Sequence, residues 1–317
     1  MSIKRNQLAW PRLVGLVAMH MGCLGLIWVQ WSVFCIVAAV AMYLIRAFAL
    51  TAFYHRYFSH RAFKTSRVAQ FAGALVGVLA MQKGPLWWAA HHRHHHKESD
   101  EHDDVHSPVA EGFFWSHIGW IVAKRNSDVR NDLIPDWLAF PELKWLEKYS
   151  LGIGFAFGIC LFAFGQWLDL VAPALRAAGP SLLVWVFFVS TVSLYHATYA
   201  VNSIAHLFGS RQFNTNDNSR NNFVVALLTL GEGWHNNHHR YQSSARQGFL
   251  WWQIDVTYYV LLLLRNVGLV WDLRPVPQSV LSATNPNGRR QRPLGIRASP
   301  STERDCNMDG LDNWETR

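Results

Sequence analysis

Three groups of regularly spaced histidines are the residues of this sequence best suited to chemistry. Residues 55–60 read HRYFSH, residues 92–96 read HRHHH, and residues 235–239 read HNNHH. In the last two groups, histidines at positions i, i+3 and i+4 share one face of a helix. Neutral imidazole is a strong ligand of divalent transition metals, and a nitrogen-rich set favours iron, zinc or copper over magnesium or calcium. The pattern therefore predicts a transition-metal site.

Spacing alone leaves two questions open. The run HHRHHH at residues 91–96 contains two sets with i, i+3, i+4 spacing, one that starts at His91 and one that starts at His92. His55 and His60 are five residues apart, a turn of about 140° on a regular helix. This pair therefore needs either a distorted helix end or two different metals.

Four apolar stretches predict the helices that must position these groups. Each is close to the roughly 20 residues that cross the hydrocarbon of a bilayer as a helix. They cover residues 13–29, 31–53, 151–170 and 181–201. Of the 16 histidines, only His20 and His196 fall within these stretches. We interpret these two, together with His102 and His117, as ordinary polar residues and not as ligands.

Composition and charge agree with a membrane protein. Hydrophobic residues make up 50% of the 317 residues and charged residues 16%, against about 25% in typical soluble domains. The net charge of +8 comes from Lys and Arg that flank apolar segments or lie near the C-terminus. This distribution is typical of inside-facing loops and not of a nucleic-acid-binding stripe. It places the histidine groups on the cytoplasmic side.

Other segments carry further expectations. Arg46 lies near the end of the second stretch, where a long side chain can reach the membrane surface. The apolar stretch 68–81 is short for a crossing and predicts an interfacial helix. Residues 249–264 contain Asp255, so we expect a helix packed on the cytoplasmic face and not a fifth span. Residues 279–317 are polar and punctuated by Pro and Gly, and are predicted to be a disordered tail.

In this setting the histidine groups resemble the three histidine boxes of the membrane fatty acid desaturases, and most closely those of the stearoyl-CoA (Δ9 acyl-CoA) branch. The second box of that branch, HRxHH, corresponds to residues 92–96 and selects the register that starts at His92. The third box with its preceding turn corresponds to GEGWHNNHH at residues 231–239. The family element NSxAHLFG corresponds to residues 202–209.

The resemblance implies an all-α integral membrane protein with about four transmembrane helices and a cytoplasmic helical cap that carries a dimetal site of two Fe2+ ions. Nine imidazoles are too many for one metal, which also argues for two. The implied ligands, with Asn202 acting through a water, are His55, His60, His92, His95, His96, His206, His235, His238, His239 and Asn202. The carboxylates expected to orient ligand imidazoles are Glu98, Asp100, Asp103, Asp104 and Glu232.

The resemblance also implies an oxidoreductase, an O2-dependent desaturase that inserts a cis double bond, at Δ9 for this branch, into a saturated long-chain acyl-CoA. By position in the motifs, Gln82, Trp88 and Tyr199 line or support the acyl tunnel. Lys124 and Arg125 match a basic pair that contacts the CoA phosphates. Together these five residues form the expected substrate site.

One departure from the family concerns the head group of the substrate. Ala90 and His91 replace the Arg-Asp that precedes the second box in the family. This leaves room for an acyl-lipid or acyl-carrier-protein substrate. The chain has neither a cytochrome b5 haem motif nor a ferredoxin-type Cys cluster, so electrons are expected from a separate donor such as ferredoxin, or cytochrome b5 with its reductase.

Two other enzyme or protein classes compete with this interpretation. Membrane fatty acyl hydroxylases and alkane monooxygenases use similar histidine boxes. A histidine-rich metal transporter would place its ligands near mid-membrane, whereas here they gather at span ends. We therefore expect a desaturase domain over residues 1–278, its cap formed by residues 54–150 and 202–278, in the cytoplasmic membrane of a bacterium or the endoplasmic reticulum of a eukaryote.

Overall fold

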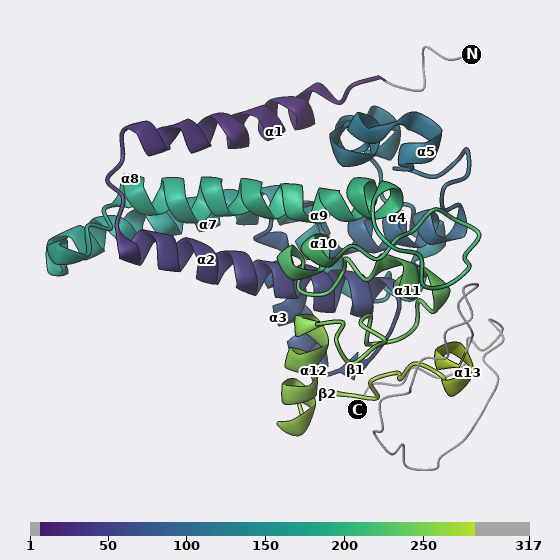
Figure 1. The fold of residues 1–317 in the computed structure, drawn as a ribbon. Coiled ribbons are helices and arrows are strands. Elements are labelled where there is room, and N and C mark those ends of the chain that lie inside the picture. Colours follow the sequence, from purple (N-terminus) through teal and green to yellow (C-terminus); the bar gives the residue numbers. More distant parts are fainter. Residues whose placement is uncertain (1–6, 283–317) are drawn as a thin grey trace.

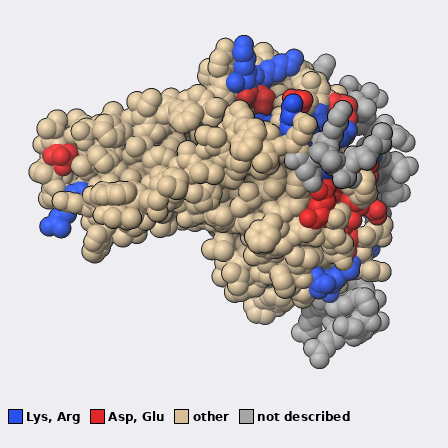
Figure 2. Space-filling model, turned by 90° about the horizontal axis from the view of Figure 1, so that it is seen from above, with Lys and Arg blue, Asp and Glu red and all other residues tan. Residues whose placement is uncertain are grey.

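Long parallel helices dominate the computed structural model, which describes residues 7–282 (Figure 1). Four helical segments are long and apolar enough to cross a membrane, as the sequence predicts. These spans are Trp10–Ile27, Val33–Ser59, Pro141–Val171 and Gly179–Leu207. Except for one short turn at residues 173–175, the remaining elements gather at one end of the spans and form a cap, the segments 60–140 and 208–282. Charged side chains also gather at the cap end, and the surface of the spans is mostly uncharged (Figure 2).

One of the four spans is a single unbroken helix, and the other three are built from seven helical pieces. The four spans are α1 (Trp10–Gly22) with the 3-10 helix η1 (Cys23–Ile27), α2 (Val33–Phe48) with the π-helix η2 (Ala49–Ser59), α7 (Pro141–Val171), and α8 (Gly179–Leu182) with the π-helix η7 (Leu183–Val189) and α9 (Ser190–Leu207). The second and fourth spans run beyond their predicted ends at residues 53 and 201, because the backbone stays helical after the apolar stretch stops. These extensions carry His55 and His206 to the cap end of the spans.

The cap consists of short helices and one pair of strands. β1 (Lys64–Thr65) pairs antiparallel with β2 (Val270–Trp271), with Lys64 opposite Trp271. The helices are α3 (Arg67–Val78), α4 (Pro85–Lys97), α5 (Pro108–Glu111), η3 (Trp115–Gly119), α6 (Trp120–Val122), η4 (Lys124–Asn126), η5 (Asn131–Leu133), α10 (Phe223–Leu228), α11 (His235–Arg240), α12 (Val256–Asn266) and α13 (Gln278–Leu281), with η6 (Pro173–Leu175) on the opposite side, after α7. Helix α13 occupies the start of the predicted disordered tail, and the rest of that tail, 283–317, lies outside the described residues.

Two short apolar helices lie at the boundary between spans and cap. Helix α3 has 12 residues, in agreement with the expected interfacial helix. Helix α12 has 11 residues and runs across the direction of the spans (Figure 1). It begins at Asp255, whose carboxylate accepts the backbone N–H of Tyr258 at 3.0 Å. Eleven residues rise only about 16 Å, so α12 is not a fifth span.

The expectation that Arg46 reaches the membrane surface is wrong. Its side chain is completely buried between spans. The guanidinium donates to the backbone oxygens of Leu79 (3.1 Å) and Val186 (3.3 Å) and to the hydroxyl groups of Ser190 (2.7 Å) and Thr191 (2.5 Å). A buried cation is tolerated when its donors are satisfied, and here hydroxyl groups and carbonyls of neighbouring helices satisfy them.

A buried ion cluster joins the second span to the C-terminal part of the cap. Arg56 Nη2 lies 2.9 Å from Asp255 Oδ1 and 3.0 Å from Glu232 Oε1, and all three side chains are buried. Because Arg56 follows His55 and Glu232 precedes the helix α11, this cluster fixes the two elements next to each other. The histidines of η2 and α11 therefore face the same space.

Candidate metal centre

The π-helical end of the second span solves the spacing problem of His55 and His60. The His60 N–H donates to the His55 carbonyl at 3.3 Å, the i to i+5 bond that defines a π-turn. The two rings then meet edge to face, with centroids 4.9 Å apart. Both histidines belong to one cluster, so the distorted helix end is the correct alternative and two separate metals are not needed for this pair.

Helix α4 carries the second histidine box. Pro85 is its first residue, and the carboxylate of Glu147 accepts the N–H groups of Leu86 and Trp87 at 3.0 Å each, which caps the helix. His95 is buried and His92 and His96 are partly buried on the face toward the spans. Helix α11, with Trp234 immediately before it, delivers the third box.

Five imidazoles form a first cluster. They come from η2 and the residue that follows it, from α4 and from α11. Its members, whose ligand atoms all lie within 4.8 Å of one another, are His55, His60, His92, His96 and His238. Their Nε2 atoms converge: His60 and His92 are 2.8 Å apart, His92 and His96 2.9 Å, His96 and His238 2.8 Å, and His238 and His55 3.1 Å.

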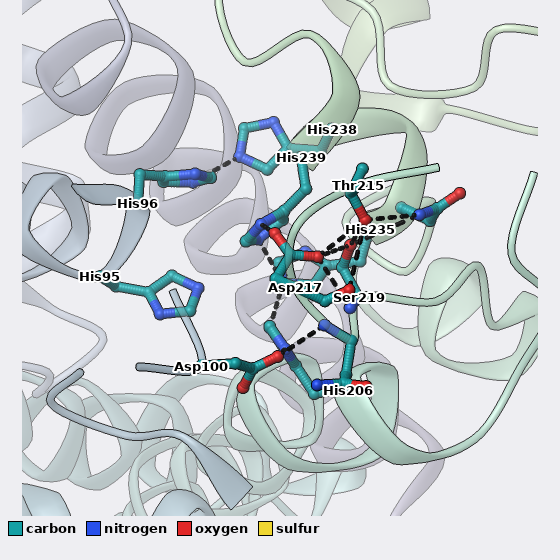
Figure 3. A network of polar contacts seen from close by, with 12 residues as sticks. His95, His96, Asp100, His206, Thr215, Asp217, Ser219, His235, His238 and His239 are labelled. Atoms are coloured by element: carbon teal, nitrogen blue, oxygen red, sulfur yellow. Dashed lines mark hydrogen bonds and ion pairs between the residues drawn. The ribbon is translucent and has the colours of Figure 1, made fainter. Parts of the chain in front are cut away.

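Four imidazoles form a second cluster beside the first (Figure 3). Its members are His95, His206, His235 and His239. The Nε2 atom of His235 lies 3.0 Å from that of His206 and 3.1 Å from that of His239. The Nε2 atom of His95 has no hydrogen-bond partner among the described residues. Each HxxHH box therefore contributes to both clusters.

Hydrogen bonding alone does not satisfy these nitrogens. In the second cluster the buried Nε2 atom of His95 has no hydrogen-bond partner among the described residues. The neutral His239 donates its Nδ1–H to Asp217, so its Nε2 atom carries a lone pair. Imidazole nitrogens about 2.0–2.1 Å from one ion and about 90° apart are separated by about 3 Å. The observed spacings of 2.8–3.1 Å match this arrangement, so the residues present fit one metal ion in each cluster.

The other half-buried histidines behave differently. His20 Nε2 lies 3.0 Å from His196 Nε2, and His196 Nδ1 lies 3.0 Å from His117 Nε2. His117 Nδ1 lies 2.8 Å from the Ser203 hydroxyl. Each ring nitrogen faces one partner, so one consistent set of donors and acceptors satisfies this whole series of hydrogen bonds. This supports their interpretation as ordinary polar residues.

Carboxylates orient four of the nine clustered imidazoles by accepting Nδ1–H. His95 pairs with Asp104 at 2.9 Å, His206 with Asp100 at 3.0 Å, His239 with Asp217 at 2.6 Å, and His55 with Glu232. Such partners fix the tautomer and turn Nε2 toward the metal. Asp100, Asp104 and Glu232 confirm the prediction, whereas Glu98 pairs with Lys97 and Asp103 with His102. Asp217 was missed, since it lies in an irregular loop far from the boxes.

Electrostatics favour the neutral imidazole at six of the nine clustered histidines. Burial lowers the pKa of His60, His92, His96, His235 and His238 well below its usual value, and that of His239 to about 4. At His95 burial is outweighed by Asp104, and the pKa is raised. Burial alone would raise the pKa of Asp100, Asp104 and Asp217, but the facing histidines reverse this and lower it. The carboxylates are therefore ionised and hold their imidazoles in place.

An apolar cavity of about 740 Å³ reaches the first cluster at His92, and Asn202 also lines it. Among the predicted substrate residues, Gln82, Trp88 and Tyr199 line it. Lys124 and Arg125 lie outside its lining. Arg125 pairs with Glu111 and its guanidinium lies 4.4 Å from the Trp115 ring. Their role in binding a CoA phosphate stays a prediction.

His106 is a site residue that the sequence analysis missed. It is buried, it lines the cavity, and its ring centroid lies 4.1 Å from that of His95. With His95 and Asp104 it forms a third close group of metal-binding residue types. No box spacing marks His106, so only its position in the fold reveals it.

Comparison with known proteins identifies the family. A family model described as fatty acid desaturase matches residues 26–262. The chain belongs to the fatty acid desaturase family. This desaturase is 36% identical over 277 residues to an sn-1 stearoyl-lipid 9-desaturase of Anabaena variabilis, covering 85% of this chain and 95% of that protein.

Two plant proteins extend the comparison. The desaturase is 37% identical over 255 residues to acyl-CoA 5-desaturase AL21 of Anemone leveillei, covering 79% of this chain and 74% of that protein. It is 36% identical over 244 residues to Delta-9 acyl-lipid desaturase 1 of Arabidopsis thaliana, covering 74% of each. The protein is therefore an oxidoreductase of fatty acyl chains, and its relatives are named for both lipid-linked and CoA-linked substrates.

Proposed function

We propose that this protein is an O2-dependent desaturase that inserts a cis double bond, at Δ9, into a saturated long-chain acyl group, with an Fe2+ ion in each histidine cluster. The observation that supports this most is the convergence of nine imidazoles in two adjacent clusters at one end of an apolar cavity. When bound, such ions, together with O2 and electrons from the donor, would supply the oxidant that removal of hydrogen from an unactivated methylene requires.

The side chains of the cavity hold and orient the acyl chain. Trp88 stacks on the ligand His92, with ring centroids 5.0 Å apart and planes inclined by 23°, and so joins the apolar wall to the first cluster. The amide of Gln82 donates to the Thr198 hydroxyl at 2.9 Å, which ties the segment before α4 to α9 across the cavity. Asn202, also in the lining, is proposed to hold a metal-bound water. This rigid wall limits which carbons meet the clusters.

Other parts of the proposal follow from the family resemblance. The desaturase domain spans residues 1–278 with its cap on the cytoplasmic side, in a bacterial cytoplasmic membrane or the endoplasmic reticulum. Electrons come from a separate donor such as ferredoxin, or cytochrome b5 with its reductase. Two head groups fit this proposal. One is CoA, for which Lys124 and Arg125 are the proposed contacts. The other is a membrane lipid, which the names of the Anabaena and Arabidopsis relatives support.

Desaturation is tested with the full-length protein in lipid nanodiscs, loaded with Fe2+ and supplied with NADPH, ferredoxin, its reductase and O2. We expect monounsaturated products whose double bond is located by gas chromatography and mass spectrometry. His95→Ala abolishes product formation, whereas His94→Ala, one position away and in neither cluster, retains it. A hydroxylated product, or no product from the reduced, iron-loaded protein with either substrate type, would overturn the proposal.

A further inference from the structure

The acyl cavity is open along one side. Its wall includes three turns of α7, where Leu151, Phe155, Ile159 and Phe162 line the cavity although they are 63%, 55%, 70% and 39% exposed. On α1 the lining residues Pro11, Gly15 and Ala18 are likewise exposed. Residues that are both lining and exposed mark a place where the cavity meets the outside. The opening therefore lies between α1 and α7.

The opening faces the hydrocarbon of the bilayer. Both α1 and α7 belong to membrane spans, so their exposed apolar faces contact lipid. From Leu151 to Phe162 the helix rises about 16 Å, which is about half of the roughly 30 Å hydrocarbon core. Residue 151 lies at the cap end of the apolar part of α7. The opening thus covers the acyl-chain depth of the leaflet nearest the cap.

Helix α1 is attached to the fourth span and the cap at its two ends. Near the cap, Arg12 donates to the carbonyls of Ile121 (3.2 Å) and Ser127 (2.7 Å). Near the far end, a side chain at Gly22 would collide with Phe188, 2.3 Å away. None of these contacts involves α7. The middle of α1 therefore forms one edge of the opening.

Two cations lie at the cap end of the same cavity. Arg12 and Lys83 both line it. The ammonium group of Lys83 lies 5.5 Å from the Trp87 ring centroid. The head groups of the leaflet begin at this depth, and the anionic group of a phospholipid head group is its phosphate. Asp128 lies near both cations and Glu147 near Lys83, but neither carboxylate lines the cavity. The charged groups that line the end of the opening are therefore positive and complement a phospholipid whose chain lies in the cavity.

We propose that the acyl chain enters sideways from the leaflet nearest the cap, through the opening between α1 and α7, while it is still attached to a phospholipid whose phosphate lies near Arg12 and Lys83. This rests on the proposed desaturase function and selects the lipid-linked substrate. An acyl-CoA, which approaches from water, has no need of an opening at this depth.

The substrate class is tested by supplying each substrate alone. The iron-loaded protein with its electron donor is placed in nanodiscs of distearoyl-phosphatidylcholine without CoA, or in nanodiscs of unreactive diphytanoyl lipid with stearoyl-CoA. We expect a double bond on the intact phospholipid. Conversion of stearoyl-CoA with no conversion of the phospholipid would overturn the lipid entry and leave the desaturase function intact. Conversion of neither would overturn both.

A matched pair of variants tests the route. Gly15 lines the opening and Gly152 does not, and a side chain at either meets nothing within 4 Å. Gly15→Trp is expected to lower conversion of the phospholipid at least tenfold, and Gly152→Trp to leave it unchanged. Equal activity of the two variants would contradict entry through this opening.

Photo-crosslinking tests the same route without turnover. Benzoylphenylalanine replaces Ile159 in the opening, or Gly152 as the control, in metal-free protein in the phospholipid nanodiscs. Mass spectrometry is expected to find more adduct with intact phospholipid at position 159 than at position 152. An unlabelled ether-linked stearoyl phospholipid is expected to compete with a labelled one for crosslinking at position 159 and not at position 152. Equal, non-competed labelling at both positions would show ordinary lipid contact and overturn the proposal.

Discussion

His239 donates its Nδ1–H to Asp217 across 2.6 Å, and its Nε2 then lies 3.1 Å from Nε2 of His235 (Figure 3). The carboxylate comes from a loop 22 residues earlier in the chain. Asp217 is itself held by the N–H of Ser219 at 3.0 Å. The orientation of a proposed metal ligand is thus set by a residue outside the histidine boxes.

Replacement of Asp217 is expected to weaken the second metal site. Asp217→Asn removes the charge that holds the His239 ring, and loss of such a partner typically costs about 10–100-fold in metal affinity. Competition with a chelator, followed by metal analysis, measures the change. Asp103→Asn, whose carboxylate pairs with His102 outside both clusters, serves as the control. Equal affinities in the two variants would contradict the orienting role.

Metal content should fall in two separate steps. His95→Ala removes a ligand of the second cluster only, and His60→Ala removes one of the first only. We expect each single variant to lose about one of two ions and the double variant to lose both, because each cluster keeps its own ligands. Mass spectrometric metal analysis of purified protein counts the ions. Loss of both ions in His95→Ala would show a single shared site.

The buried cluster of Arg56, Glu232 and Asp255 should dominate local stability. Arg56→Met leaves two buried carboxylates without their cation, a change that costs about 3–5 kcal/mol. Arg67→Met removes the exposed pair with Glu142 and should cost no more than about 1 kcal/mol. Denaturant unfolding in detergent compares the two variants. A similar small loss in both would show that the buried cluster contributes little.

Acid should destabilise the cap through Asp136. This carboxylate accepts from Arg93 Nη1 at 2.7 Å and Arg61 Nε at 2.8 Å. Burial alone would raise its pKa, but the two guanidinium groups reverse this and lower it. The pKa in the folded protein is therefore below the unfolded value of about 3.9. The stabilisation is present above about pH 4 and is lost as the pH falls through the lower folded value.

Thermal unfolding of the metal-free protein between pH 6 and pH 3 measures this effect. Wild type should lose stability below about pH 4 more steeply than Asp136→Asn, which has no carboxylate to protonate at this position. Parallel pH profiles of the two proteins would exclude Asp136 as a contributor.

The sequence by itself determined the features that depend on local pattern. Apolar stretches of sufficient length predict the four spans, because the bilayer demands a minimum length of helix. The i, i+3, i+4 spacing puts imidazoles such as His235 and His239 on one helix face, since the period of a helix is a property of the backbone. Neither inference requires knowing which elements pack against these helices.

Only the tertiary structure decided which groups meet. That His92 and His95 serve different clusters, that Asp217 holds His239, and that Arg46 is buried among carbonyls and hydroxyl groups all depend on elements distant in the chain. The same holds for the opening between α1 and α7. These contacts come from the packing of whole helices, and the spacing of residues along one helix carries no information about the partner that packing brings to it.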